Sequence, residues 1–270
     1  MSVKAPFKVA AVQMVSEPSL AANLDAAGAL VAEAAAKGAR LAVLPEWFCL
    51  MGRTEHDKLA IRERDGDGPI QSFLAGAAAK HGVWVIAGTV PLFAGDPEKV
   101  RNASLVYDAA GRRVARYDKI HLFDFTGENE KYRESNTIEP GDAPVAVDSP
   151  FGRIALSICY DVRFPELYRR LAPMDLITVP SAFTATTGAA HWEVLLRARA
   201  VENLAWVIAP AQGGEHANGR RTHGHSMIVD PWGGVAASLA RGPGVVLAEI
   251  DPNVTDKVRA SLPALGHRVL

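Results

Sequence analysis

Cysteine is scarce in this chain, whose 270 residues include only Cys49 and Cys159. Two cysteines cannot build the dense disulfide framework of a small secreted domain, and their separation excludes a Cys-x-x-Cys redox motif. In a reducing compartment such a pair is more often two free thiols than a disulfide. We therefore predict two free thiols, either of which can be reactive.

Long apolar runs, a surplus of one charge and a zinc motif are also missing. No apolar stretch is long enough to span a bilayer, and the opening MSVKAPFKVAAVQM lacks the features of a secretory signal, so we predict a cytoplasmic protein. Lys and Arg total 29 against 30 for Asp and Glu, which argues against nucleic acid or membrane as a partner. We therefore predict a small-molecule substrate. No Cys and His spacing matches a zinc site, so we predict that the histidines are structural and that no metal is bound.

The chain does contain enough hydrophobic sequence for one substantial domain. Hydrophobic side chains make up 49% of the sequence and charged ones 22%, and α/β folds of this length often form one domain. Runs rich in Val, Ile and Leu alternate with Ala-rich stretches of helical period, which predicts buried strands alternating with helices. We predict a single α/β domain over residues 1–270.

Helix and strand boundaries are clearly marked in the first half. Ser19 as a cap and Gly38 as a stop predict a helix over 19–37, and Gly82 ends a second helix over 69–81. Strands are predicted at 9–14, 41–46, 83–90, 103–108 and 112–119, with a turn at 109–111 between the last two.

A similar order of elements recurs in the second half. Apolar strands at 154–161, 175–183 and 205–212 alternate with helical stretches, and a two-strand unit over 226–240 turns at 231–233. Each half alone would expose one face of its sheet, so two stacked halves with outer helices bury both. The predicted fold is a four-layer α-β-β-α sandwich of two mixed sheets, with simple strand and helix alternation as the alternative.

Cys159 lies at a change of pattern in GRIALSICYDVRFPELYRRLA, where an apolar strand meets a polar segment and then a helix. Such an elbow places the thiol at the carboxyl edge of a sheet, where ligand crevices form and backbone N–H groups can meet a developing oxyanion. A cysteine that only packs as a small hydrophobe fits this context equally well. The partners of the thiol must therefore decide between the two interpretations.

Two charged residues at strand ends can supply those partners. Glu46 closes LAVLPE among large apolar residues, where a carboxylate can take the thiol proton and return it to a leaving amine. Lys119, in YDKIHLFDF, can stabilise an oxyanion and favour the thiolate. Taken singly, the two residues are more typical of a solvated strand end and a surface lysine.

Together, these segments resemble the nitrilase superfamily of carbon–nitrogen hydrolases. The resemblance runs from about residue 7 to 268 and rests on PEWFCLMG, KIHLFD, ESNTIEPGD and SICYDVRFPELYRRLA, in the order and approximate spacing that the family shows. It implies the four-layer sandwich, the absence of any cofactor, and a catalytic set of Glu46, Lys119 and Cys159. The thiolate would attack the amide carbon, with the oxyanion held by Lys119 and the backbone N–H of Tyr160, and water would then hydrolyse the acyl thioester.

A second family glutamate, which would help to position substrate and water, maps onto Glu134 in ESNTIEPGD. The stretch before it, FTGENEKYR, is one residue shorter than in some relatives. Glu128 and Glu130 therefore remain alternatives for this role.

Two further segments, VPSAFTATTGAAHWEVLLRARAVEN and GHSMIVDPWG, resemble the Nit group, whose members hydrolyse amides of α-keto dicarboxylates rather than nitriles. One implied activity releases cysteinylglycine and α-ketoglutarate from deaminated glutathione; the other, ω-amidase, cleaves α-ketoglutaramate or α-ketosuccinamate. Ser181 favours the first, because ω-amidases tend to have glycine there. The alternative to an enzyme is a binding protein of the same fold that has no catalytic activity.

Residues that bind the substrate are expected beside the nucleophile and at the next strand end. Either substrate carries a carboxylate, which Arg163 is best placed to bind in bidentate fashion. An ion pair of Arg163 with Asp161 or Glu166 is an equally good alternative. Phe183, with the two threonines that follow it at 184 and 187, is expected to line the acyl pocket.

By resemblance, a homodimer or larger homo-oligomer is expected, since superfamily members usually pair through outer helices. LYRRLA and HWEVLLRARAVENLA would supply such an interface. A papain-like thiol hydrolase is the competing enzyme class, but it needs a histidine beside Cys159 where the neighbouring motifs supply Glu and Lys.

Overall fold

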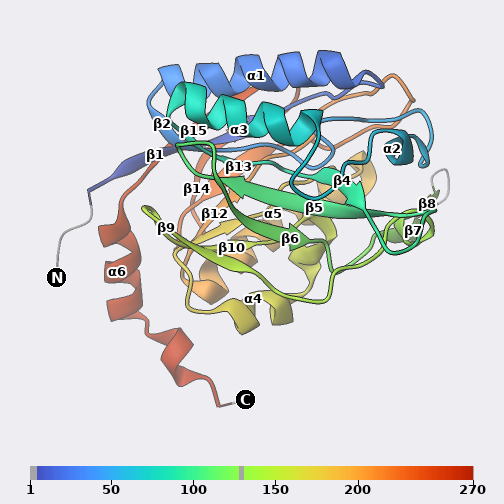
Figure 1. Cartoon of the computed structure of the whole chain (residues 1–270). Coiled ribbons are helices and arrows are strands. Elements are labelled where there is room, and N and C mark those ends of the chain that lie inside the picture. The colour runs from blue at the N-terminus through green and yellow to red at the C-terminus, as the bar shows by residue number, and fades with distance from the viewer. Residues whose placement is uncertain (1–4, 128–130, 270) are drawn as a thin grey trace.

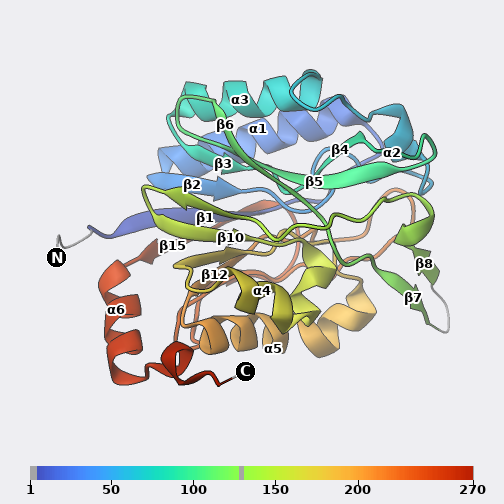
Figure 2. The same ribbon diagram turned by 60° about the horizontal axis from the view of Figure 1, so that its bottom comes forward.

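Two β-sheets lie face to face between two pairs of helices in the computed structural model, which describes residues 5–127 and 131–269 (Figure 1). Figure 2 shows the layers edge-on: α1 (Leu20–Ala36) and α3 (Pro69–His81) cover one sheet, and α4 (Pro165–Leu171) and α5 (Ala185–Asn203) cover the other. This arrangement confirms the predicted four-layer α-β-β-α sandwich.

The first sheet contains strands from both ends of the chain. β1 (Phe7–Gln13) runs parallel to β2 (Ala39–Val43), and β2 runs parallel to β3 (Trp84–Ile86). β5 (Val100–Tyr107) is antiparallel to β3, to β4 (Val90–Phe93) and to β6 (Arg113–Asp118). At the far edge, β15 (Gly244–Ile250) pairs antiparallel with β1. β15 comes from the second half of the chain and therefore completes a sheet whose other strands come from the first half.

The second sheet is built from the second half of the chain. Its strands lie in the order β14 (Val235–Leu239), β13 (Ser226–Val229), β12 (Trp206–Ala209), β11 (Leu176–Thr178), β10 (Gly152–Leu156) and β9 (Ala146–Ser149). The smaller elements are α2 (Asp57–Ala60), α6 (Pro252–Ser261), the hairpin of β7 (Asp124–Thr126) and β8 (Lys131–Arg133), and the 3₁₀ turns η1 (Glu134–Asn136), η2 (Cys159–Arg163) and η3 (Ala264–His267).

Side-chain alternation along the strands explains the layering. On β1, Val9 belongs to a buried cluster that includes Ile177 of the opposite sheet, whereas Val12 belongs to another cluster with Val31 of α1. Because successive side chains of a strand point to opposite faces, one strand can contribute side chains both to the core between the sheets and to the core under the helices.

The predicted helix boundaries in the first half are confirmed. The Ser19 hydroxyl accepts a hydrogen bond from the Ala22 N–H (3.3 Å) at the start of α1, and Gly82 ends α3 in the left-handed conformation, with φ of 63°. None of the described helices offers a stretch long and apolar enough to cross a bilayer.

The single strand predicted over 83–90 is wrong, because the chain forms β3 and β4 with a break at Ala87–Thr89. Gly88 has φ of 51°, and a Cβ there would overlap the carbonyl oxygen of Pro45. This close approach, open only to glycine, lets Thr89 Oγ1 accept a hydrogen bond from the Trp47 N–H (2.9 Å). This hydrogen bond fixes the segment that follows β2, which contains Glu46.

Candidate active site

The four residues predicted to carry the chemistry converge from four separate segments. Glu46 follows β2, Lys119 follows β6, Glu134 opens η1 and Cys159 opens η2. All are buried, with exposed fractions of 1%, 0%, 8% and 7%, respectively. Three ionisable side chains and a thiol thus share a region that is nearly closed to water.

The backbone at Cys159 is the predicted elbow between strand and helix. Cys159 has φ of 50°, a left-handed conformation that is uncommon for a residue with a side chain. Its N–H donates to the carbonyl oxygen of Pro180 (2.9 Å), which ties the elbow to the end of β11. A costly conformation held in place by the surrounding structure is typical of functional positions.

A buried carboxylate joins this elbow to the lysine segment. One oxygen of Asp161 accepts from the Ile158 N–H (2.8 Å) and the Tyr117 hydroxyl (2.7 Å), and the other accepts from the His121 N–H (3.1 Å). Tyr117 and His121 flank Lys119 in the chain. Asp161 therefore fixes the position of the lysine relative to the thiol, a role that the sequence interpretation missed.

Lys119 lies between two carboxylates. Its Nζ donates to Glu46 Oε1 (2.8 Å) and to Glu134 Oε2 (2.7 Å). Glu46 is held further by Asn102 Nδ2 (3.1 Å) on Oε1 and by the Ala182 N–H (3.0 Å) on Oε2. These bonds satisfy the charged groups in a setting where an unpaired charge would be very costly.

Electrostatics in this cluster favour a charged lysine and a neutral thiol. Burial alone would lower the pKa of Lys119, but Glu134 and then Glu46 outweigh it and raise that pKa well above its ordinary value. Burial raises the pKa of Cys159 well above its ordinary value, and the Glu46 carboxylate adds to the rise. Lys119 favours the thiolate as predicted, but its effect is the smaller one.

Glu134 has a raised pKa as well. Burial is the main cause, opposed by Lys119 and reinforced by the negative charge of Glu46. The physical reason is that a single ammonium cannot fully compensate two buried carboxylates. Its Oε2 also accepts from the Phe123 N–H (2.8 Å). The alternatives Glu128 and Glu130 lie outside the described residues.

A cavity opens onto this cluster and contains most of the predicted substrate contacts. Among the expected residues, Tyr160, Arg163, Phe183, Thr184 and Thr187 line it beside Glu46, Glu134 and Cys159. The sequence interpretation missed Phe123, Ala182 and Arg220, which complete the lining. Phe123 lies within the KIHLFD motif, but nothing in the sequence around Arg220 indicated its place.

Ser181 differs from the other expected contacts, because it is not among the residues that line this cavity. Its side chain is fully buried, and its hydroxyl donates to the Val179 carbonyl oxygen (3.0 Å). Ser181 thus supports the wall from behind, next to Ala182.

Arg163 lines this cavity. It lies over the rings of Tyr160 and Phe183, at 5.6 Å and 5.5 Å from their centroids, and its Nη2 is 3.2 Å from His191 Nδ1. Among the residues that the structure describes, it forms no ion pair with Asp161 or Glu166. Over residues 5–127 and 131–269, no group of three or more His, Cys, Asp or Glu is arranged to hold a metal ion.

Comparison with known proteins places this fold and site in a family. The carbon–nitrogen hydrolase family model matches residues 8–260. Deaminated glutathione amidase of Synechocystis sp. (strain PCC 6803 / GT-S) is 44% identical over 270 residues, covering 98% of each chain. Saccharomyces cerevisiae Nit3, a member of branch 10 of the nitrilase superfamily, superposes with a TM-score of 0.89 at 29% identity, covering 99% of this chain and 98% of that one.

A third relative is an amidase from Nesterenkonia sp. AN1, with a TM-score of 0.81 and 25% identity over 97% of this chain and 94% of that one. It was solved as a mutant with the acetamide moiety of fluoroacetamide covalently added at the active-site cysteine. The present chain therefore belongs to the carbon–nitrogen hydrolase family of the nitrilase superfamily. It is an enzyme that hydrolyses carbon–nitrogen bonds of amides.

Proposed function

We propose that this amidase hydrolyses deaminated glutathione through a thioester at Cys159. The observation that carries the mechanism is the buried cluster in which Lys119 bridges Glu46 and Glu134 beside the thiol. The substrate assignment is supported by the 44% identical relative of that name. Arg163 and Arg220 in the cavity wall suit an acyl or leaving group that carries a carboxylate.

The first chemical step forms a carbon–sulfur bond. Because the thiol pKa is raised, the resting enzyme holds Cys159 protonated, and Glu46 accepts that proton as sulfur attacks the amide carbon. The carbonyl oxygen becomes an oxyanion that Lys119 and the Tyr160 N–H stabilise. Glu134 accepts two contacts from the Lys119 ammonium and thereby keeps it charged and oriented.

The second step breaks the carbon–nitrogen bond. Glu46 gives its proton to the leaving nitrogen, the amine departs and an acyl thioester remains. Water then loses a proton to Glu46 and attacks the thioester, and sulfur leaves with the returned proton, which restores the starting state. The covalent adduct at the cysteine of the Nesterenkonia amidase supports a nucleophilic thiol in this position.

Comparison of two substrates tests this proposal. Purified protein is supplied with deaminated glutathione and, separately, with α-ketoglutaramate, and release of α-ketoglutarate is measured. We expect kcat/KM to favour deaminated glutathione by at least about tenfold, or about 1.4 kcal/mol. Preference for α-ketoglutaramate would instead assign the protein to the ω-amidases, and turnover of neither would refute both substrate assignments.

The matched control uses the two cysteines. Cys159→Ala is expected to lower kcat/KM by more than about a thousandfold, because the nucleophile is gone. Cys49→Ala is expected to retain turnover, since Cys49 lies fully buried outside the cavity and burial raises its pKa to about 12. Equal activity of the two variants would contradict the assigned nucleophile.

We also propose that the protein acts in the cytoplasm on a small molecule. Both cysteines are free thiols, which is in keeping with a reducing compartment. The near balance of basic and acidic residues gives no general attraction to polyanions.

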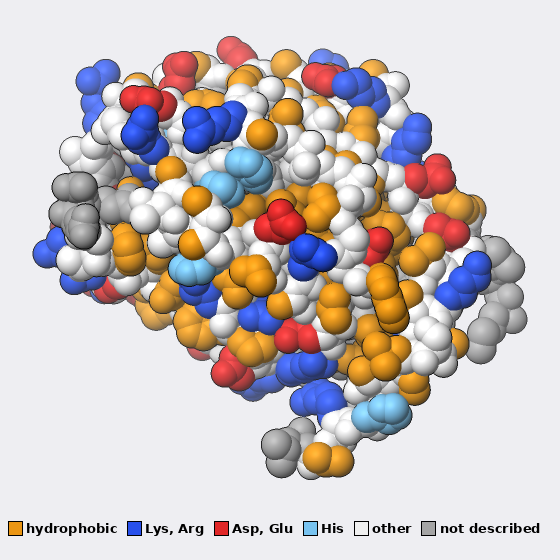
Figure 3. All heavy atoms as spheres, turned by 180° about the vertical axis from the view of Figure 1, so that it is seen from behind, with side chains coloured by type: hydrophobic (Ala, Val, Ile, Leu, Met, Phe, Trp, Pro, Cys, Tyr) orange, Lys and Arg blue, Asp and Glu red, His pale blue; other side chains and the backbone are white. Residues whose placement is uncertain are grey.

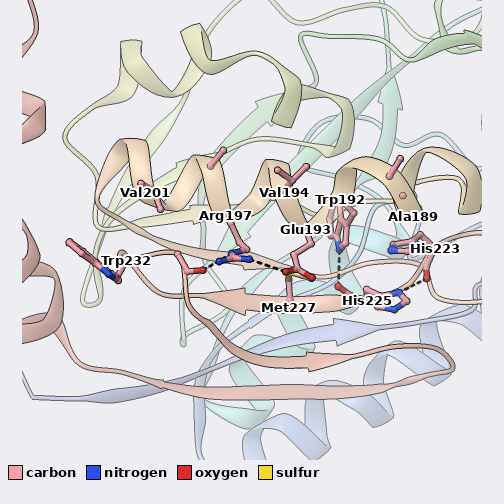
Figure 4. A pocket seen from close by; sticks show the side chains of 14 residues that line it. Ala189, Trp192, Glu193, Val194, Arg197, Val201, His223, His225, Met227 and Trp232 are labelled. Carbon is pink, nitrogen blue, oxygen red and sulfur yellow. Dashed lines mark hydrogen bonds and ion pairs between the residues drawn. The ribbon is translucent and has the colours of Figure 1, made fainter.

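We infer further that the chain forms a homodimer through α5. Exposed Ala190, Val194, Ala198 and Val201 follow one another at helical spacing along α5, with Val194 61% exposed. Figure 4 shows Val194 and Val201 of this face among the residues that line one pocket, together with Trp232, which is 65% exposed. Figure 3, which views the molecule from behind, shows hydrophobic side chains spread over this side. Small and apolar residues let two such helices approach closely in an isologous contact.

A further inference from the structure

Arg220 has an unusual environment next to the catalytic residues. It lies in the connection between β12 and β13, and its Nη2 donates to the Ala182 carbonyl oxygen (2.9 Å). Its guanidinium lies over the Tyr132 ring at 4.9 Å from the centroid. Its Nε is buried and has no hydrogen-bond partner among residues 5–127 and 131–269. A buried donor without an acceptor is costly, so this position suits a ligand oxygen.

Arg220 lines two cavities. One is the catalytic cavity. The other is lined by both polar and apolar residues: Trp47, Leu50, Met51, Gly52, Thr54, Glu55, Lys58, Asn218 and Arg220. Two adjacent residues of the chain line different cavities: Glu46 lines the catalytic cavity, and Trp47 lines the second one. Trp47 has φ of 58°, so the backbone is left-handed at the point where the chain passes from one cavity to the other.

The second cavity has an excess of positive charge. Lys58 is 7% exposed, donates to Glu55 Oε2 (2.8 Å) and to Thr137 Oγ1 (3.0 Å), and lies 4.8 Å from the centre of the Trp47 ring. Among the residues that the structure describes, Glu55 is the one acidic residue that lines the cavity, against the two cations Lys58 and Arg220. A single carboxylate on a ligand would balance that charge.

We propose that the second cavity binds the leaving amine of the substrate and that Arg220 binds its carboxylate. This inference rests on the proposed amide hydrolysis, in which Glu46 protonates the leaving nitrogen. Because Glu46 must contact that nitrogen, the departing group lies on the Glu46 side and extends past Arg220 toward Trp47. The ligand class is an amino acid or short peptide with a free carboxylate and a small apolar or thiol side chain, which Leu50 and Met51 can contact.

This arrangement makes the leaving group a determinant of specificity. An amide that releases only ammonia leaves the second cavity empty and gains nothing from Arg220. An amide whose leaving group carries a carboxylate can use that binding energy in the transition state of carbon–nitrogen cleavage. Arg163, which lines the same cavity over the rings of Tyr160 and Phe183, remains for the acyl part.

The test compares two substrates that share one acyl group. Deaminated glutathione has a free glycine carboxylate on its leaving part, and its C-terminal glycinamide has a neutral amide there. We expect the wild-type kcat/KM to favour the carboxylate by at least about tenfold. In Arg220→Ala this preference should fall to near unity. Arg221→Ala, which removes the same charge from an adjacent side chain that is 75% exposed, should retain the preference.

Each outcome decides between the alternatives. Equal loss on both substrates in Arg220→Ala would show a structural or acyl-side role and overturn the inference. Unchanged preference in that variant would also overturn it, as would a wild-type enzyme that cleaves both substrates equally well; in these three cases the proposed amidase function stands. Failure of the wild-type enzyme to cleave either substrate would refute the proposed function and this inference together.

Discussion

At the scale of single residues, the site combines a charged lysine with a protonated thiol. Thiol hydrolases that pair cysteine with histidine lower the thiol pKa, whereas here burial and Glu46 raise it. In the proposed mechanism, the nucleophile is therefore generated only when Glu46 accepts its proton during attack. This difference also separates the enzyme from a papain-like mechanism, which the sequence kept as an alternative.

Alkylation of Cys159 by iodoacetamide provides a test of this protonation state. Below the thiol pKa, the thiolate fraction rises about tenfold for each pH unit, so the rate should still be rising at about pH 9 without a plateau. The rate is measured by mass spectrometry of the Cys159 peptide from pH 6 to pH 9. A plateau near neutral pH would contradict a raised thiol pKa, and Cys49→Ser controls for modification of the other thiol.

At the scale of elements, the position of α5 depends on Gly188, although glycine is a poor helix former. Gly188 lies near the start of α5, and a Cβ there would overlap Cβ and Cγ of His223. The His223 ring stacks on that of His225, with centroids 4.2 Å apart. The packing of α5 against His223, in the connection that leads into β13, thus depends on the missing side chain.

Two glycine-to-alanine substitutions separate this packing effect from helix propensity. Gly188→Ala should lower the free energy of unfolding by about 1–3 kcal/mol, because overpacking outweighs the better helix former. Gly76→Ala on α3 meets nothing within 4 Å, and it should raise the free energy of unfolding by about 0.5–1 kcal/mol. Urea denaturation measures both, and stabilisation by both substitutions would contradict the described packing of α5.

At the scale of the whole molecule, the exposed face of α5 leads to a prediction about assembly. The wild-type protein should elute with about twice the chain mass of 28.8 kDa in size exclusion with light scattering. Val194→Asp places a charge on the α5 face and should give a folded monomer. Val114→Asp, at a valine that is 41% exposed on β6, should leave the dimer intact. A dimeric Val194→Asp protein would place the interface elsewhere.

The sequence by itself determined the fold class, the helices of the first half and the carbon–nitrogen hydrolase family. Periodicity and caps located α1 and α3, and the motifs around Glu46, Lys119 and Cys159 identified the residues that the fold brings together. These features are local, since they depend on propensity, side-chain period and residue type within one segment. The break between β3 and β4 was not predicted, because it depends on the contact of Gly88 with the distant Pro45 carbonyl.

Only the tertiary structure decided how distant segments meet. It turned Ser181 away from the cavity, brought Asp161 between the lysine and cysteine segments, and placed Arg220 beside Ala182. It also added β15 to the sheet begun by β1. Each of these depends on contacts between residues far apart in the chain, and a single sequence carries no local signal for such contacts, because packing rather than propensity determines them.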